Sequence, residues 1–276
     1  MIIQHLSNKI NIAFLLIFLS IETASCSISV CSWNLQNFGN SKSNSEIDFI
    51  ATTIQQFDVI AIQEVLAGNS GVQVVVKLVD MMNRKGKSWE YIISNPTNSS
   101  SSNTSERHAF IWNKKTVSRL GAAWLENHYV AQIDREPYFA TFRKDGKEFT
   151  IVSFHAKPKA KQPETEIKYF KFFPALYPKL NLIFCGDFNC PQSHTVFNPL
   201  KTMGFKPAFA GQKTTLRMKC IQNDCLASEY DNFFYYPKKT IFVKSGVVHF
   251  YKSFSTMEKA RRISDHLPVF FIFRLI

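Results

Sequence analysis

Hydrophobic and polar residues alternate with two different periods in the first third of the chain. Residues 27–34 alternate and end at polar side chains, as a β-strand does, and residues 58–63 form a short buried strand. Residues 72–82 have the pattern of an amphipathic helix. An earlier helix is capped by Ser45 and carries apolar residues at three-to-four spacing: Ile47, Ile50, Ile54 and Phe57. The order strand, helix, strand, helix is typical of an α/β layer.

The rest of the chain predicts short strands separated by turn-rich segments. The strands are expected at 89–94, 109–112, 138–143, 149–154, 182–185, 231–235, 241–243 and 267–273. Two more helices are expected, at 164–173 and 193–203. No internal repeat and no linker divides the chain, so residues 27–276 are expected to form a single domain.

The N-terminus has the features of a secretory signal peptide. Lys9 precedes the almost unbroken apolar run 10–21, and the small residues 23–26 follow it. The run is shorter than the ~20 apolar residues that a membrane-spanning helix needs. We therefore expect residues 1–26 to be removed and the protein to be secreted, periplasmic or extracellular, as a monomer with no stable protein partner. Cys26 leaves a lipid anchor open, which would hold the domain at a membrane.

Composition and charge narrow the function classes. The chain has 26 Phe and 4 Trp and is 45% hydrophobic, so it can bury a full core and does not have the composition of a disordered chain. It carries 33 Lys and Arg against 21 Asp and Glu, a formal net charge of +12. This charge favours a polyanionic partner, either nucleic acid or an anionic membrane, although plain solubility explains it equally well.

Cysteines of an exported chain can oxidise. The sequence favours a disulfide between Cys220 and Cys225, or from Cys190 to either of them. A zinc site is disfavoured, because the cysteine pairs are spaced at the edge of the usual range and have no paired histidine.

Several predicted strands end or begin at clusters of polar residues, and α/β sheets bind ligands in the crevice outside their strand ends. The carboxylate and amide oxygens are hard ligands that suit Mg²⁺, Mn²⁺ or Ca²⁺, and the histidines can exchange protons near neutral pH. Cleavage of a phosphodiester needs a cation, a base for water and an acid for the leaving oxygen. The residues are Asn34, Glu64, His155, Asp187, Asn189, Asp265 and His266.

The same clusters carry a family resemblance. In chain order they are Trp33-Asn34, Gln63-Glu64, Glu106-Arg107, Arg135-Glu136-Pro137, His155, Gly186-Asp187-Phe188-Asn189, Tyr230-Asp231 and Ser264-Asp265-His266-Leu267-Pro268. From about Ser27 to the C-terminus the sequence resembles the endonuclease/exonuclease/phosphatase superfamily, and within it most closely the deoxyribonuclease I family. The resemblance implies a single catalytic domain with an α/β fold, a four-layered sandwich of two packed mixed β-sheets flanked by helices.

The resemblance implies a metal site. Glu64 would hold the catalytic divalent ion, Mg²⁺ or Mn²⁺, and Ca²⁺ would be a further ion. Asn34 and Asp265 would lie near that ion. Asp187 and Asn189 would contact the metal or the phosphate.

It also implies two histidine pairs. His266 paired with Asp231, and His155 paired with Glu106, would act as general base and general acid, and which does which is left open. A carboxylate behind an imidazole fixes its tautomer and favours its charged form. Arg135 would bind the scissile phosphate.

Two positions depart from the deoxyribonuclease pattern. Leu66 and Thr104 stand where that pattern has an Arg and a Tyr that reach into the minor groove. Affinity would then depend more on phosphate contacts, which are independent of sequence and sensitive to salt. These contacts would come from a basic run that otherwise reads as a solvated helix face: Lys157, Lys159, Lys161, Lys168 and Lys171.

The leading hypothesis is a secreted, metal-dependent endonuclease that cleaves DNA with little sequence specificity. A sphingomyelinase or a phosphoinositide phosphatase of the same superfamily is the alternative enzyme. A non-catalytic subunit that binds DNA or a membrane is the alternative of another class, and the full set of metal and imidazole residues argues against it.

Overall fold

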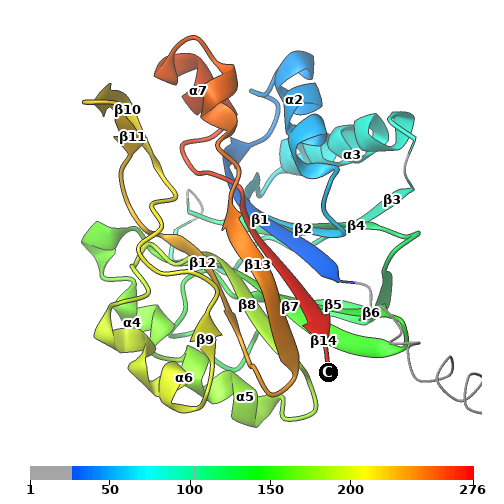
Figure 1. Ribbon diagram of the computed structural model, residues 1–276, viewed down its shortest axis with the longest axis vertical. Coiled ribbons are helices and arrows are strands. Elements are labelled where there is room, and N and C mark those ends of the chain that lie inside the picture. Colours follow the sequence, from blue (N-terminus) through cyan, green and yellow to red (C-terminus); the bar gives the residue numbers. More distant parts are fainter. Residues whose placement is uncertain (1–26, 87, 102–103) are drawn as a thin grey trace, which may run out of the picture.

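The computed structural model describes residues 27–86, 88–101 and 104–276, which form two six-stranded β-sheets packed face to face (Figure 1). The first sheet has the strand order β13-β14-β1-β2-β4-β3. Its strands are β1 (Ile28–Phe38), β2 (Val59–Leu66), β3 (Trp89–Ile93), β4 (Glu106–Asn113), β13 (Thr240–Val247) and β14 (Val269–Leu275). Because β1 pairs in parallel with β2 and antiparallel with β14, this sheet is mixed.

The second sheet has the order β5-β6-β7-β8-β12-β9 and is also mixed, since β7 and β8 are parallel. Its strands are β5 (Ser118–Leu125), β6 (Tyr138–Lys144), β7 (Lys147–His155), β8 (Leu182–Asp187), β9 (Lys206–Pro207) and β12 (Asp231–Tyr235). A separate hairpin of β10 (Leu216–Ile221) and β11 (Asp224–Leu226) projects from the body of the molecule (Figure 1).

Helices cover the outer face of each sheet, which gives four layers and confirms the predicted fold class. The first sheet is covered by α2 (Asn44–Ile54), α3 (Asn69–Arg84) and α7 (Met257–Ile263) (Figure 1). The second sheet is covered by α4 (Glu164–Ile167), α5 (Phe173–Leu176) and α6 (Asn198–Thr202). The two sheets bury a third apolar cluster between them.

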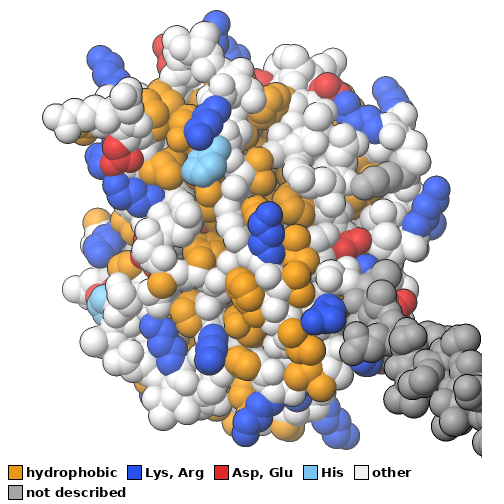
Figure 2. All heavy atoms as spheres, in the orientation of Figure 1, with side chains coloured by type: hydrophobic (Ala, Val, Ile, Leu, Met, Phe, Trp, Pro, Cys, Tyr) orange, Lys and Arg blue, Asp and Glu red, His pale blue; other side chains and the backbone are white. Residues whose placement is uncertain are grey.

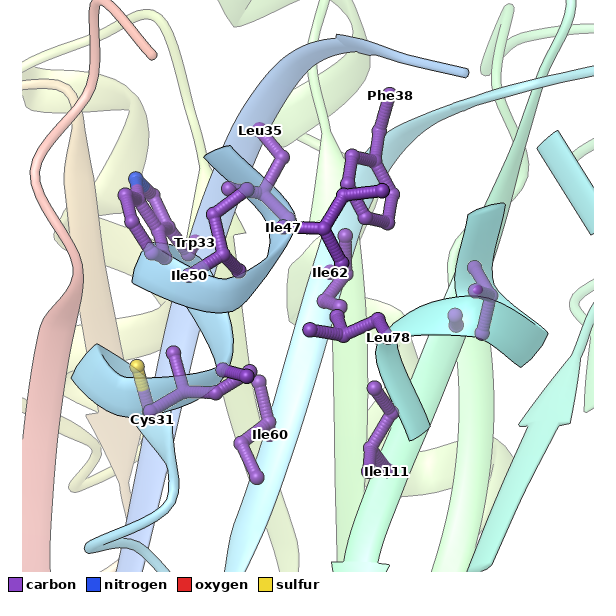
Figure 3. Packing of buried hydrophobic residues seen from close by; sticks show 14 of the residues in the cluster. Cys31, Trp33, Leu35, Phe38, Ile47, Ile50, Ile60, Ile62, Leu78 and Ile111 are labelled. Carbon is purple, nitrogen blue, oxygen red and sulfur yellow. The ribbon is translucent and has the colours of Figure 1, made fainter. Parts of the chain in front are cut away.

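The apolar stripe of α2 explains how this helix packs. Ile47 and Ile50 lie on its buried face and pack over Trp33 and Leu35 of β1 (Figure 3). Leu78 of α3 lies in the same cluster. Since burying one such side chain contributes roughly 1.5–3 kcal/mol, this layer holds β1 and β2 firmly in register.

Some predicted boundaries are corrected by local chemistry. Ser43, and not Ser45, caps α2, because its hydroxyl accepts from the Glu46 N–H while the Glu46 carboxylate accepts from the Ser43 N–H at 2.7 Å. The helix predicted at 164–173 divides into α4, a 3₁₀ turn and α5. Phe170 and Phe173 are both buried there, and the 3₁₀ spacing of three residues aligns them.

The helix predicted at 193–203 is shorter, with a 3₁₀ turn before α6. Pro199 occupies the first turn of α6, where its missing N–H costs nothing. Five strands or α-helices were not predicted: β5, the two-residue β9, α7 and the hairpin strands β10 and β11. β5 is half exposed, so its alternation is weak, and Gly121 interrupts it with a φ of +59°.

The signal peptide predicted for residues 1–26 lies outside the described residues and stays a prediction. Among the residues that the structure describes, no helix is both long and apolar enough to cross a membrane.

Candidate active site

A cleft of about 360 Å³ opens where β1, β2, β7 and β8 end, beside the start of β4 and the segment before β14. It is lined by most of the residues predicted from the sequence: Glu64, Glu106, Arg135, His155, Asp187, Asn189, Asp265 and His266. Asn34 and Asp231 lie directly behind this lining and are buried. The structure thus brings together residues that are up to 232 positions apart, from Asn34 to His266.

His155 at the end of β7 is paired with Glu106 at the start of β4. Its Nδ1 lies 2.8 Å from Oε2 of Glu106, and both side chains are buried. Arg135 donates from Nη1 to the same carboxylate oxygen at 3.2 Å and from Nη2 to the carbonyl of Ala156. Arg135 therefore supports Glu106, a contact that could not be predicted from the sequence pattern.

His266 is paired with Asp231 at the start of β12. Its Nδ1 lies 2.8 Å from Oδ2 of Asp231, and Oγ1 of Thr214 donates to that oxygen at 2.7 Å. Trp33 fixes the backbone here, because its indole Nε1 donates to the carbonyl of His266 at 2.8 Å. Thr214 was not predicted, since it lies in a segment without periodicity or motif.

Asp187 lies between the two histidines. Its Oδ2 is 3.5 Å from Nε2 of His155 and 3.5 Å from Nε2 of His266. Nδ2 of Asn34 donates to this oxygen at 3.2 Å, and the backbone N–H of Asn189 donates to Oδ1 at 2.8 Å. Because each Nδ1 faces its own carboxylate, both Nε2 atoms point toward Asp187 and the cleft.

The chain reaches Asp187 through a glycine that no other residue can replace. Gly186 has a φ of +132°, and a Cβ there would lie 1.9 Å from the carbonyl oxygen of Phe154 in β7. β7 and β8 thus approach each other closely, which brings His155 and Asp187 together.

Glu64 is held in place at the end of β2 in the left-handed region, with a φ of +59°. Its Oε1 accepts from Nδ2 of Asn34 at 2.8 Å, and its Oε2 accepts from the backbone N–H of Asn37 at 2.9 Å. The Glu64 side chain is 23% exposed, and that of Asp265 is 27% exposed with Arg261 at 3.4 Å. Both carboxylates can therefore reach a ligand in the cleft.

These oxygens fit a hard divalent cation. The carboxylates of Glu64 and Asp265 are the donors that Mg²⁺, Mn²⁺ and Ca²⁺ prefer, and Asn34 holds Glu64 in place through its amide nitrogen. A second group, of Asp187, Asp231 and His266, also brings ligand atoms within 4.8 Å of one another. That group suits a metal less well, because Nδ1 of His266 is already hydrogen-bonded to Asp231.

The two histidines have opposite electrostatic surroundings. Burial, together with the Arg135 charge, lowers the pKa of His155 to about 4. Burial alone would also lower the pKa of His266, but the charges of Asp231 and Asp187 outweigh it and raise this pKa well above its usual value. Burial raises the pKa of Glu106, against the opposing effect of Arg135.

The predicted phosphate-binding lysines lie at the edge of the cleft. Pro158 lines the cleft between Lys157 and Lys159, which themselves do not. Lys157 Nζ is 3.7 Å from Oε1 of Glu166, so its charge is partly compensated, whereas Lys159 is exposed. On the face shown in Figure 2, lysine and arginine side chains are spread over the surface and do not gather in one patch.

Both departures from the deoxyribonuclease pattern, Leu66 and Thr104, line the cleft.

The cysteine prediction is partly corrected. Cys220 and Cys225 form a disulfide at the end of the projecting hairpin, whereas Cys190 is a free and buried thiol. The open alternative that paired Cys190 with either of them is therefore wrong, because Cys190 packs in the core beneath the second sheet.

Comparison with known proteins shows the family to which the chain belongs. Residues 31–266 match the model of the Endonuclease/Exonuclease/phosphatase family, and the chain belongs to that family.

Curated relatives extend over almost the whole chain. A deoxyribonuclease from Thioalkalivibrio is 26% identical over 290 residues, covering 98% of this chain and 77% of that protein. Human deoxyribonuclease gamma is 26% identical over 283 residues, covering 93% of this chain and 89% of its own. A solved mannosyl-6-phosphatase from Bacteroides thetaiotaomicron has a TM-score of 0.65 at 17% identity, covering 90% of this chain and 99% of its own, which shows a common fold alone.

Proposed function

We propose that this protein is a secreted endonuclease that hydrolyses phosphodiester bonds of DNA, with little sequence specificity and with the aid of a divalent metal ion. One observation carries the proposal. Two buried histidine–carboxylate pairs present their Nε2 atoms to Asp187 in a single cleft, next to the carboxylates of Glu64 and Asp265.

The two histidines move protons in this proposal. With Nδ1–H donated to a carboxylate, each Nε2 is free to take a proton from water or to give one to the leaving oxygen. Glu64 and Asp265, with Asn34 behind them, would hold Mg²⁺ or Mn²⁺, with Ca²⁺ as a further ion. The bound cation would neutralise charge that develops on the phosphate. Asp187 and Asn189 orient the reacting groups, and Arg135 lies in the same cleft to meet the phosphate.

DNA is the substrate that the comparisons favour. Relatives named deoxyribonuclease cover more than nine-tenths of the chain, and the net charge of +12 suits a polyanion. Lys157 and Lys159 flank the cleft and would contact the phosphate backbone. A disulfide in a short surface hairpin is typical of an oxidising compartment, which supports secretion through the predicted signal peptide.

One observation favours a second candidate, a phosphodiesterase that acts on sphingomyelin at a membrane. The projecting hairpin carries Met218 and Ile221, which are 74% and 59% exposed, beside the basic residues Arg217 and Lys219. Exposed apolar side chains among cations are typical of surfaces that dock on anionic membranes.

A plasmid-nicking assay separates the candidates. Supercoiled plasmid is incubated with Mg²⁺ plus Ca²⁺, with and without EDTA, in parallel with assays for release of phosphocholine from sphingomyelin and of inositol phosphates. We expect nicking that EDTA abolishes and that the His266→Ala variant lacks. Cleaved lipid together with intact plasmid would refute the nuclease hypothesis. Plasmid that the protein binds but does not cleave would indicate the non-catalytic subunit.

A further inference from the structure

Two buried polar atoms face each other behind the His155 pair. Oε1 of Glu106 and Nε2 of His108 lie 3.8 Å apart, and neither has a hydrogen-bond partner among the described residues. The His108 side chain is completely buried. A bridging water with two hydrogen bonds of about 2.8 Å at its tetrahedral angle would hold its partners about 4.5 Å apart, so these two atoms are too close for one.

The hydrogen bonds around His108 favour the tautomer in which Nε2 carries the proton. Nε2 of Gln63 donates to Oγ of Ser153 at 2.8 Å, so the Ser153 hydroxyl keeps its own hydrogen to donate. Nδ1 of His108 lies 3.1 Å from that hydroxyl and can accept its hydrogen. In the tautomer with the proton on Nε2, this proton points at the Glu106 carboxylate.

Strand geometry sets up this contact from both sheets. Glu106 and His108 are two residues apart on β4 and point to the same face, as do Ser153 and His155 on β7. Each residue of one pair meets one of the other: Glu106 meets His155, and His108 meets Ser153.

Arg135 does not fix both carboxylate oxygens. It donates to Oε2, which is also the oxygen that His155 uses. Rotation of a carboxylate about its last torsion is soft, so a second contact on Oε1 is needed to hold the orientation. His108 is the residue that faces Oε1.

We propose that His108 is a positioning residue, whose Nε2–H attracts Oε1 of Glu106 across 3.8 Å and so keeps Oε2 directed at Nδ1 of His155. The inference rests on the function proposed for the His155–Glu106 pair. The site thus contains a row of three buried side chains, in which Glu106 and His155 line the cleft and His108 lies behind them.

Three substitutions of His108 test this. His108→Phe keeps the ring and removes the donor, His108→Gln keeps an amide nitrogen near the place of Nε2, and His108→Asn moves that nitrogen to the place of Nδ1. We expect kcat for plasmid nicking to fall about tenfold in the Phe and Asn variants, the effect of one hydrogen bond to a charged group, with KM within about twofold. The Gln variant should stay within about threefold of wild type.

Two controls separate positioning from packing. Melting temperatures of the three variants should not follow their kcat values, and adding His108→Phe to Glu106→Gln should cost nothing further. Equal loss in the Gln and Phe variants, additive loss in the double variant, or wild-type kcat in the Phe variant would each overturn the proposal. If the Phe variant does not fold, the contrast between Gln and Asn decides.

A readout independent of cleavage keeps this test apart from the proposed function. The Nδ1 proton of His155, shifted downfield in the NMR spectrum by its bond to Glu106, should be present in wild type and His108→Gln and lost in His108→Phe. If wild type cleaves no DNA, the proposed function has failed, and this resonance alone decides on His108. A resonance that persists in His108→Phe would refute the positioning role.

Discussion

The two histidine–carboxylate pairs share one geometry but have opposite surroundings. In each, Nδ1 lies 2.8 Å from a buried carboxylate, and each pair joins one sheet to the other. Glu106 has Arg135 beside it and His108 behind it, whereas Asp231 is backed by Thr214 and has Asp187 nearby. Burial and Arg135 lower the pKa of His155, and carboxylates raise that of His266. Equal distances therefore do not imply equal charge, and substitutions should separate the two pairs.

Loss of either imidazole should have the largest effect. His155→Ala and His266→Ala should each lower the rate of plasmid nicking by about 10²-fold or more, because each removes a proton-transfer group. His249→Ala is the matched control, since His249 is exposed and outside the cleft. Near-wild-type turnover in either site variant would end the assignment for that histidine.

The two carboxylates proposed to hold the metal ion should differ in their effect on metal use. Glu64, whose two oxygens are held by Asn34 and Asn37, should matter more than Asp265, which is already paired with Arg261. We expect Glu64→Gln to raise the Mg²⁺ concentration for half-maximal nicking by tenfold or more, roughly the loss of a charge-assisted contact, and Asp265→Asn to raise it less. A metal titration of each variant checks this, and the reverse order would move the main ligand to Asp265.

Neutralising Glu106 should destabilise the protein more than neutralising Asp231. Glu106→Gln leaves the buried Arg135 without its carboxylate, so we expect a loss of about 3 kcal/mol and a melting temperature lower by about 10 °C. Asp231→Asn removes one of several neighbouring negative charges and should lower it by about 3 °C or less. Scanning calorimetry of the two variants measures the difference, and equal losses would contradict the contrast.

A smaller effect is expected from the pH dependence of stability, to which His108 behind Glu106 contributes and Thr214 behind Asp231 does not. Burial lowers the pKa of His108 to about 4 from a usual 6.5. Between these two pH values His108 is protonated in the unfolded chain and neutral in the folded chain. The free energy of unfolding must then fall as pH drops toward 4, by about 2 kcal/mol at pH 5.

Urea unfolding at pH 7 and pH 5 measures this. His108→Phe should lose about 2 kcal/mol less than wild type over that interval. Thr214→Val, the corresponding change behind Asp231, removes no titrating group and should leave the pH dependence as in wild type. Identical pH dependence in wild type and His108→Phe would show that folding does not lower the pKa of His108.

The fold and most of the cleft could be predicted from the sequence because both depend on local features, namely the periodicity of apolar residues and short motifs. Periodicity located every strand of the two sheets except β5 and β9, and motifs located Asp187, Asp265 and His266 at the ends of strands. What it could not predict depends on contacts between sheets. Thr214 reaches Asp231 from a segment without pattern, and the opposition of His108 to Glu106 exists only once β4 faces β7.

The order of strands in the first sheet bears on when the site can form. β14, the last strand of the chain, lies between β13 and β1, and His266 comes just before it. During synthesis, Glu106 and His155 are therefore made long before His266, the partner of Asp231. The first strand, β1, can pair with β14 only after the end of the chain has been made. A catalytic site assembled in this order is incomplete until His266 and β14 have been synthesised.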